Sequence, residues 1–397
     1  MDSRTKGAGA NRKKDKTKAM IEYGAGDIPV LDQVSFITTV YNEEGSIIEF
    51  LQSLKCQTCL PGEMIIVDGG STDRTFEMVK DFFEGWAASE DCKVKISLEV
   101  SEDIENNPPG RSNSPAINKE EVQDVLTVRL LKEPGAGISR GRNTAISKSK
   151  GKYICVSDAG CRIDPDWLEE ISSMLEKKSS SKKNPVMGGM NYADCTSFLQ
   201  KCQALCIMPG LDETSEESFM PSSRNVCFKK EDWEKAGGYP ENLDYGEDMR
   251  LNFNLKKAGC RLQFNPGAIV HWKMRENLNQ IFRQFFRYAK GDALGRMYPV
   301  RHLIRFLTGL GFLALILIAV FFSPYILLSF ILLFPAYSYR PYRRMVYKWQ
   351  GNEKCRPAPA ARIGALFFIP FLLIYIDTAK VFGYLYGLIK KQQLTFL

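Results

Sequence analysis

Acidic residues follow the predicted strands of this chain, where parallel sheets bind their ligands. Asp68 ends the apolar run MIIVD, Asp158 follows KYICVS, and YNEE, with Glu43 and Glu44, follows VSFITTV. A carboxylate in such a place suits a divalent metal or a phosphate-rich ligand. A hard cation takes several oxygen ligands, however, and Gly160 stands where a second acid close to Asp158 would be expected. The remaining ligands must come from elsewhere in the chain or from the substrate.

Strands alternate with helices along the first part of the chain, and this alternation places those acids. The apolar, β-branched runs at 34–40 and 64–70 predict buried strands, and 93–100 alternates with a period of two. The segments between them begin with helix-capping residues or show helical periodicity. The pattern predicts an α/β fold with a mostly parallel sheet, whose ligands bind at the carboxyl ends of the strands.

Composition separates the ends of the chain from its middle. The net charge is +7 over 397 residues, and residues 1–30 contain the basic stretch RTKGAGANRKKDKTK, which predicts a disordered tail near anionic lipid and no nucleic-acid partner. Residues 101–122 are rich in Pro, Asn and Ser and predict a surface insertion. The polar N-terminus lacks an apolar leader, so the catalytic part is expected in the cytosol. With two histidines in the chain, the eleven cysteines do not predict a zinc site.

The last hundred residues are apolar enough to meet a membrane. Segments 303–322 and 324–339 predict two short helices that form a hairpin at Ser323-Pro324. Residues 340–362 contain seven Lys and Arg side chains, which the positive-inside rule places in the cytosol. A third segment, 363–388, includes charged residues, and the sequence is compatible with a span, a re-entrant segment or an interfacial helix.

Several short motifs occur together in a characteristic order. They are TTVYNEE, VDGGSTD, GAGISRGRN, SDAG, SSRNVCF, AGGYPENLDYGED, VHW and QFFRY. Over roughly residues 34–290 the chain resembles the inverting family-2 glycosyltransferases of the GT-A fold. The resemblance implies a GT-A catalytic domain at 31–290, with a Rossmann-like mixed, mostly parallel sheet. Its nucleotide-sugar half would be 31–160 and its acceptor half 161–290, followed by a membrane region at 291–397.

The resemblance implies roles for residues of the donor half. Asp68 and Glu43 would contact the nucleoside of a UDP- or GDP-sugar, although the family often has Asp-Asp-Gly-Ser where this chain has Asp-Gly-Gly-Ser. Arg142 opens a predicted helix, where the N-terminus and a guanidinium favour a phosphate; a solvated helix face is the alternative. Asp158 begins the family's Asp-x-Asp motif, here shortened by Gly160, and would bind the donor diphosphate.

A divalent cation, Mg²⁺ or Mn²⁺, is the cofactor implied by the same motif. Asp158 would hold it, and His271 corresponds to a histidine that completes the metal site in some relatives; a packing or hydrogen-bonding role is the alternative for His271. Trp272, in the same VHW motif, is expected to contact substrate. Asp164 precedes Pro165 and is predicted to cap a helix instead of binding the metal.

The acceptor half provides the implied base. Asp248 would remove the proton from the acceptor hydroxyl, and Glu247 would orient the acceptor; two acids that complement a helix dipole are the alternative. Gln284, Arg287 and Tyr288 share one helix face and resemble the Q-x-x-R-W motif of polysaccharide-extending members. By that resemblance Arg287 helps to hold the diphosphate, and Gln284 and Tyr288 contact substrate.

These observations predict a membrane-anchored, metal-dependent enzyme of the hexosyltransferase type at the cytosolic face. It would transfer a sugar to a hydroxyl of a lipid-linked or growing glycan acceptor. A polyprenyl-phosphate sugar synthase is the first alternative, although a phosphate acceptor scarcely needs a base. A processive synthase is a further alternative; three apolar segments are few for an export channel in one chain, although an oligomer could supply more. A non-catalytic sugar-nucleotide-binding protein is disfavoured because Asp158, Asp248 and Arg287 are all present.

Overall fold

A nine-stranded sheet forms the centre of the computed structural model, which describes residues 28–395 except 91, 93, 102–124, 174–182, 348 and 350–351. The predicted tail, up to residue 27, and the predicted insertion, after Ser101, lie outside the described residues. The strands are β1 Val30–Val40, β2 Leu60–Asp68, β3 Lys95–Ser101, β4 Val125–Lys132, β5 Tyr153–Val156, β6 Cys161–Ile163, β7 Pro185–Asp194, β8 Val226–Lys229 and β9 Arg261–Lys273.

The sheet is mixed but mostly parallel, as expected. Its order is β3-β4-β2-β1-β5-β8-β7-β9-β6. Strands β3, β4, β2, β1 and β5 run parallel to one another, and the antiparallel pairs are β5 with β8, β7 with β8 and β6 with β9. The parallel half therefore places the ends of β1, β2 and β5, with their acidic residues, at one edge. The predicted α/β class with its mostly parallel sheet is confirmed.

Hydrophobic residues cover both faces of the sheet and explain why its central strands read as continuous apolar runs. Side chains alternate along a strand, so Phe36 contributes to one core and Ile37 to the other. The same alternation divides Ile66 and Val67 of β2. Helices pack on both faces, which leaves the carboxyl ends of the strands as the open edge of this layer.

Twelve α-helices and three short 3₁₀ segments are found among the described residues. The α-helices are α1 Ile47–Lys55, α2 Thr75–Ala87, α3 Ile138–Lys148, α4 Trp167–Ser172, α5 Phe198–Ile207, α6 Lys230–Lys235, α7 Glu247–Lys257, α8 Leu278–Leu294, α9 Pro299–Phe321, α10 Phe330–Tyr337, α11 Tyr339–Val346 and α12 Pro359–Thr395. The 3₁₀ segments are Leu211–Glu213, Pro324–Ser329 and Glu353–Cys355.

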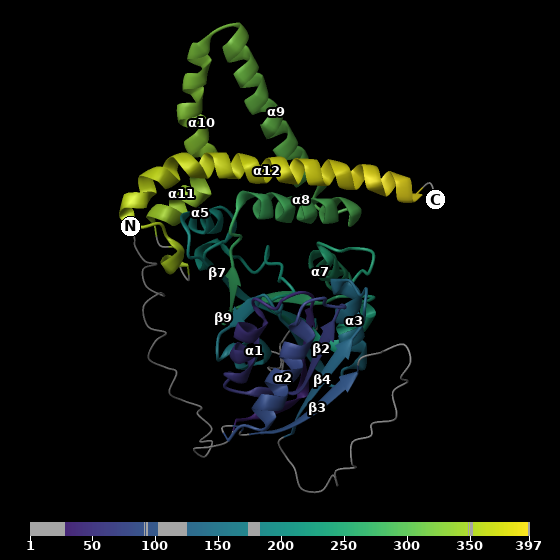
Figure 1. The fold of residues 1–397 in the computed structure, drawn as a ribbon. Helices are drawn as coiled ribbons and strands as arrows, with labels where there is room; N and C mark the ends of the chain where they lie inside the picture. Colours follow the sequence, from purple (N-terminus) through teal and green to yellow (C-terminus); the bar gives the residue numbers. More distant parts are fainter. Residues whose placement is uncertain are drawn as a thin grey trace, which may run out of the picture.

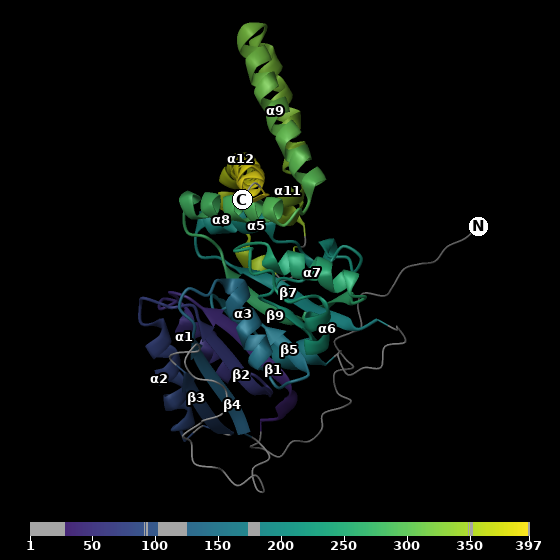
Figure 2. The same cartoon turned by 90° about the vertical axis from the view of Figure 1, so that its right-hand side faces the viewer.

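Three layers follow one another away from the sheet edge. Helix α8 lies above that edge, α12 lies along α8, and α9 and α10 form a hairpin that projects beyond α12 (Figure 1). The view along α12 shows the same order, with α9 rising past it (Figure 2). A third hydrophobic cluster joins the layers, because Ile281 and Phe285 of α8 pack with Ile369, Leu372 and Ile376 of α12.

The C-terminal helices follow the predicted segments with changed bounds. The first, predicted at 303–322, is α9; the second, predicted at 324–339, begins as a 3₁₀ turn and continues as α10. The third, predicted at 363–388, is the longer helix α12. Helices α9 and α12 are long and apolar enough to cross a membrane by length and composition. The predicted domain boundary at 290 falls inside α8.

Candidate active site

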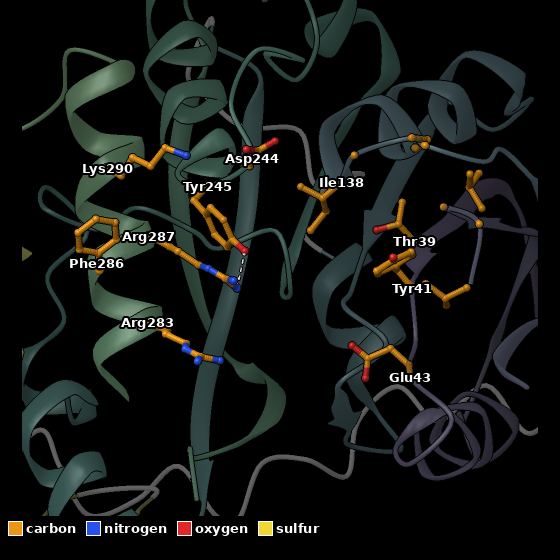
Figure 3. A pocket seen from close by; sticks show the side chains of 18 of the residues that line it. Thr39, Tyr41, Glu43, Ile138, Asp244, Tyr245, Arg283, Phe286, Arg287 and Lys290 are labelled. Carbon is orange, nitrogen blue, oxygen red and sulfur yellow. Dashed lines mark hydrogen bonds between the residues drawn. The ribbon is translucent and has the colours of Figure 1, made fainter. Parts of the chain in front are cut away.

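A cavity of about 1130 Å³ lies between the carboxyl ends of the strands and helix α8 (Figure 3). One wall comes from the ends of β1 and β2 and from the loop that leads into α3. The opposite wall comes from the loop before α7, from α8 and from one residue of α12. The lining residues are Thr39, Val40, Tyr41, Glu43, Val67, Gly69, Gly70, Gly135, Ala136, Gly137, Ile138, Gly141, Asp244, Tyr245, Phe282, Arg283, Phe286, Arg287, Lys290 and Tyr386.

The loop after β2 is shaped by Asp68. This carboxylate is fully buried, and its Oδ1 accepts hydrogen bonds from the backbone N–H groups of Gly70 and Ser71, both at 2.7 Å. Gly70 has φ +92°, in the left-handed region that glycine adopts without strain. The second oxygen, Oδ2, is buried without a partner among the described residues. Asp68 thus holds the loop that lines the cavity, and a nucleotide contact through Oδ2 stays a prediction.

The loop after β1 is locked to the loop after β2. Asn42 Oδ1 accepts from the N–H of Thr72 at 2.8 Å, and the N–H of Glu43 donates to Thr75 Oγ1 at 2.8 Å. The Glu43 carboxylate accepts from Ser46 and lines the cavity. A Cβ atom added to Gly160 would lie 3.8 Å from both Glu43 carboxylate oxygens. The acid predicted for the nucleoside therefore also lies beside the shortened motif.

Arg142 joins the donor and acceptor parts of the site. Its side chain is almost fully buried, with Nη2 2.6 Å from Asp158 Oδ1 and Nη1 2.8 Å from Glu247 Oε1. The guanidinium also lies 5.2 Å from the centre of the Tyr239 ring. The alternative of a solvated helix face is wrong, because the side chain is buried. Both terminal nitrogens are bound to protein carboxylates, and a phosphate contact by Arg142 stays a prediction.

Asp158 has a second basic neighbour that the sequence analysis missed. Arg224 Nε lies 3.8 Å from Asp158 Oδ2, and its guanidinium lies 4.0 Å from the centre of the Trp272 ring. Trp272, predicted to contact substrate, therefore supports this arginine. The available signal was an arginine in SSRNVCF, directly before a short buried strand, β8. Asp158 keeps a partly exposed side chain between two arginines.

The acidic pair lies at the start of α7, as expected. Gly246 precedes it with φ +75°, and the Asp248 carboxylate accepts from the N–H of Met249 at 2.7 Å. Burial raises the pKa of Asp248 above its ordinary value of 3.8. Burial, and then the adjacent Asp248 carboxylate, raise the pKa of Glu247 to about 7. Asp248 lies three residues beyond Tyr245, which lines the cavity.

His271, one of the two residues predicted to hold a metal, is paired with another side chain. His271 Nε2 lies 2.8 Å from Asp164 Oδ1, so the hydrogen-bonding alternative describes it. The predicted cap at Asp164 is wrong, because α4 begins at Trp167 with Asp166 at its N-cap. Across the described ranges, no three His, Cys, Asp or Glu side chains are grouped to hold a metal ion. Asp158 is an available protein oxygen ligand near the cavity, and a metal site formed with His271 stays a prediction.

The three residues of the Q-x-x-R-Y motif point in two directions. Gln284 is buried and donates from Nε2 to Tyr288 Oη at 3.1 Å. Arg287 instead lines the cavity and donates from Nη1 to Tyr245 Oη at 3.0 Å (Figure 3).

Of the predicted site residues, the cavity wall contains Glu43 and Arg287. The ion pairs of Arg142 bring together Asp158 and Glu247, and Asp248 follows Glu247 at the same helix start.

Relatives of known name share limited identity with this chain. It is 25% identical over 260 residues to the succinoglycan biosynthesis protein ExoA of Rhizobium meliloti (strain 1021). The matched stretch covers 64% of this chain and 66% of that protein, just under two thirds of its length. It is 22% identical over 288 residues to the glucosyl-dolichyl phosphate glucuronosyltransferase of Haloferax volcanii, covering 67% and 79%. The mannosyltransferase PcManGT from Pyrobaculum calidifontis, solved in complex with GDP-Man and Mn²⁺, has a TM-score of 0.47 at 15% identity, covering 94% and 90%.

Two family models match the chain directly. The model described as glycosyl transferase family 2 matches residues 35–98 and 107–181, which include the loops after β1 and β2 and the shortened motif. The model described as glycosyl transferase family group 2 matches residues 153–373, more than half of the chain, from β5 through α8 into α12. The motif resemblance is thereby confirmed: the chain belongs to glycosyl transferase family group 2.

Proposed function

We propose that the protein transfers a sugar from a nucleotide-diphospho-sugar to a hydroxyl group of a lipid-linked or growing glycan, with inversion. The main observation that supports this proposal is a single cavity lined on opposite sides by two different groups of elements. The strand ends and the glycine-rich loop before α3 suit a nucleotide-sugar, and α8 with the loop before α7 suits an acceptor. A carboxylate pair of raised pKa lies at the start of α7, next to that second wall.

The donor diphosphate has a suitable place at the start of α3. Gly137 and Ile138 line the cavity at this helix N-terminus, whose first turn contains no acidic residue. Free backbone N–H groups there favour an anion, and glycine allows a phosphate to approach the backbone closely. Arg287 faces this wall from α8 (Figure 3). The two elements together would stabilise negative charge that develops on the leaving diphosphate.

Asp248 is the proposed general base. Its carboxylate takes the proton from the acceptor O–H as that oxygen bonds to the anomeric carbon. The bond between this carbon and the diphosphate oxygen breaks with its electron pair on the diphosphate. A pKa raised by burial makes Asp248 a better proton acceptor than an ordinary aspartate. Glu247, held by Arg142, positions the start of α7 and with it the base.

A divalent cation is part of the proposal, with Asp158 as its protein ligand and donor phosphates as further ligands. Bound there, it would neutralise charge on the diphosphate. Asp158 lies between Arg142 and Arg224, so its orientation is already fixed by the protein. Loss of donor consumption on addition of EDTA, restored by Mn²⁺ or Mg²⁺, is the expected result.

The C-terminal helices suit a membrane anchor with the catalytic domain at the cytosolic face. Helix α9 has 23 residues and, at 1.5 Å per residue, is roughly 34 Å long, enough for a hydrocarbon core of roughly 30 Å. Helix α12 lies across the base of the α9–α10 hairpin (Figure 1). If the hairpin enters the bilayer, α12 lies in the interface, which favours the interfacial alternative for 363–388. The basic stretch 340–362 at the hairpin base supports the cytosolic orientation.

The test uses the purified full chain with a panel of UDP-, GDP- and dTDP-sugars, and with extracted membrane lipids as acceptors. The expected result is the appearance of the sugar from one donor in the lipid phase, with release of the nucleoside diphosphate. Binding of a nucleotide sugar without any transfer to lipid or glycan acceptors would favour a non-catalytic binding protein and contradict the proposal.

A further inference from the structure

Three cations form a stripe on the cavity side of α8. Arg283, Arg287 and Lys290 are spaced by four and three residues, which places them on one face of the helix. All three line the cavity, and their side chains extend from α8 toward the wall that contains Thr39 and Glu43 (Figure 3). The acceptor wall is therefore basic along about two turns of helix.

Two of these cations lack a partner. Arg287 is bound to Tyr245, but neither the Arg283 nor the Lys290 side chain forms a hydrogen bond or ion pair within the part of the chain that the structure describes. The acids of the cavity wall are Glu43, which accepts from Ser46, and Asp244. The cavity wall thus contains three cations and two acids, and of the acids only Glu43 lies on the wall opposite α8. Unpaired cations along a binding cavity favour an anionic ligand.

The donor diphosphate accounts for only part of this positive charge. The start of α3 and Arg287 already face one another across the cavity as its proposed contacts. Arg283 lies one turn before Arg287, and Lys290 lies nearly one turn after it. Both residues lie on α8, the wall proposed for the acceptor, and neither is needed for the proposed diphosphate contacts, so their ligand is sought in the acceptor.

The side from which an acceptor arrives is apolar. Tyr386 of α12 lines the cavity, and its ring lies 5.7 Å from that of Phe286 of α8. The same helix exposes Phe382 and Ile389, at 56% and 60%. Gly383 and Gly387 allow α12 to pack directly on the backbone of α8 at Phe286 and Lys290. The edge of the cavity thus adjoins an exposed apolar surface, which suits a ligand that joins an anion to a hydrocarbon chain.

We propose that Arg283 and Lys290 bind the phosphate that links the acceptor sugar to its lipid. This inference rests on the proposed function and specifies its acceptor as a phosphate-bearing, lipid-linked glycan. Each contact would be a charge-assisted hydrogen bond from a guanidinium or ammonium group to a phosphate oxygen. The lipid chain would leave the cavity beside Tyr386, toward the exposed face of α12.

The experiment measures binding of farnesyl diphosphate, a short prenyl probe, to the purified full chain in neutral detergent. UDP is titrated separately as the donor-site probe. We expect Arg283→Gln with Lys290→Gln to weaken farnesyl diphosphate binding by at least about tenfold, since two charge-assisted bonds are lost. UDP binding should change less than about twofold. The charge-conserving variant Arg283→Lys with Lys290→Arg should bind farnesyl diphosphate as the wild type does.

A matched double variant, Lys256→Gln with Lys257→Gln at the far end of α7, controls for the loss of two charges and should bind both probes as the wild type does. If Arg283→Gln with Lys290→Gln weakened UDP binding as much as farnesyl diphosphate binding, the two cations would belong to the donor site and the inference would be overturned. The inference would also be overturned if phosphatidylglycerol or inorganic phosphate bound as tightly as farnesyl diphosphate, since any phosphate would then suffice. Failure of the wild type to bind any nucleotide would instead contradict the proposed function.

Discussion

Arg142 is the residue at which the two parts of the candidate site meet. It is almost fully buried and holds Asp158 and Glu247 at the same time. Arg142→Met would leave two carboxylates without their buried partner, and we expect unfolding to become easier by about 3–5 kcal/mol. Arg261→Gln, by contrast, breaks a pair with Glu216 that is exposed on both sides and should cost about 0–1 kcal/mol. Denaturant unfolding of both variants measures the difference; equal small losses would contradict this role.

The acidic pair at the start of α7 predicts the pH dependence of activity. Asp248 must be ionised to accept a proton, and burial raises its pKa, as it raises that of Glu247 to about 7. Activity should therefore fall as the pH drops through the raised pKa values of the pair, at a higher pH than for an ordinary aspartate.

The pH profiles of kcat/KM for the wild type and Glu247→Gln test this expectation. Burial, and then Asp248, raise the pKa of Glu247 to about 7, so this substitution should remove the upper titration of the pair and shift the acid limb to lower pH. An acid limb at the same pH in both proteins would show that the pair does not control the rate.

At the scale of elements, the contact between α8 and α12 depends on glycine. A Cβ at Gly383 would clash with the backbone of Phe286, whereas at Gly364 the nearest atom would be 3.7 Å away. We expect Gly383→Ala to destabilise the protein by about 1–3 kcal/mol through overpacking. Gly364→Ala should be neutral or stabilise it by up to about 1 kcal/mol, since alanine favours a helix. Thermal unfolding in detergent distinguishes them, and equal melting temperatures would contradict close packing at Gly383.

The elements near the strand ends could be predicted because the residues that indicate them are neighbours in the sequence. Buried apolar runs ending in an acid gave β1, β2 and β5 and the edge where the cavity lies. Strand β4 was not predicted, since it follows directly on the insertion. The ion pair of Arg142 with Glu247 and the hydrogen bond of His271 with Asp164 could not be predicted, because each joins residues about a hundred positions apart. The orientation of α12 depends on its packing against α8, which hydropathy does not report.

At the scale of the whole molecule, the α9–α10 hairpin is the proposed membrane anchor. The rings of Phe312 and Phe330 lie 5.8 Å apart, so a short Gly-Ser linker in place of residues 313–329 would remove the tip while keeping its base. We expect the wild type to resist extraction from membranes by alkaline carbonate and the shortened chain to be extracted. UDP binding should persist in both, and a shortened chain that stays in the membrane would place the anchor elsewhere.

The most direct test of the account as a whole is the rate of acceptor-dependent sugar transfer by Asp248→Asn. Asp81→Asn, an exposed substitution on α2, is the matched control. We predict that Asp248→Asn lowers kcat by about 10²–10⁴-fold with little change in donor affinity, because the proton acceptor is lost while the donor wall remains intact. Asp81→Asn should transfer at the wild-type rate. Transfer by Asp248→Asn at the rate of the control would contradict the assignment of the base and the mechanism built on it.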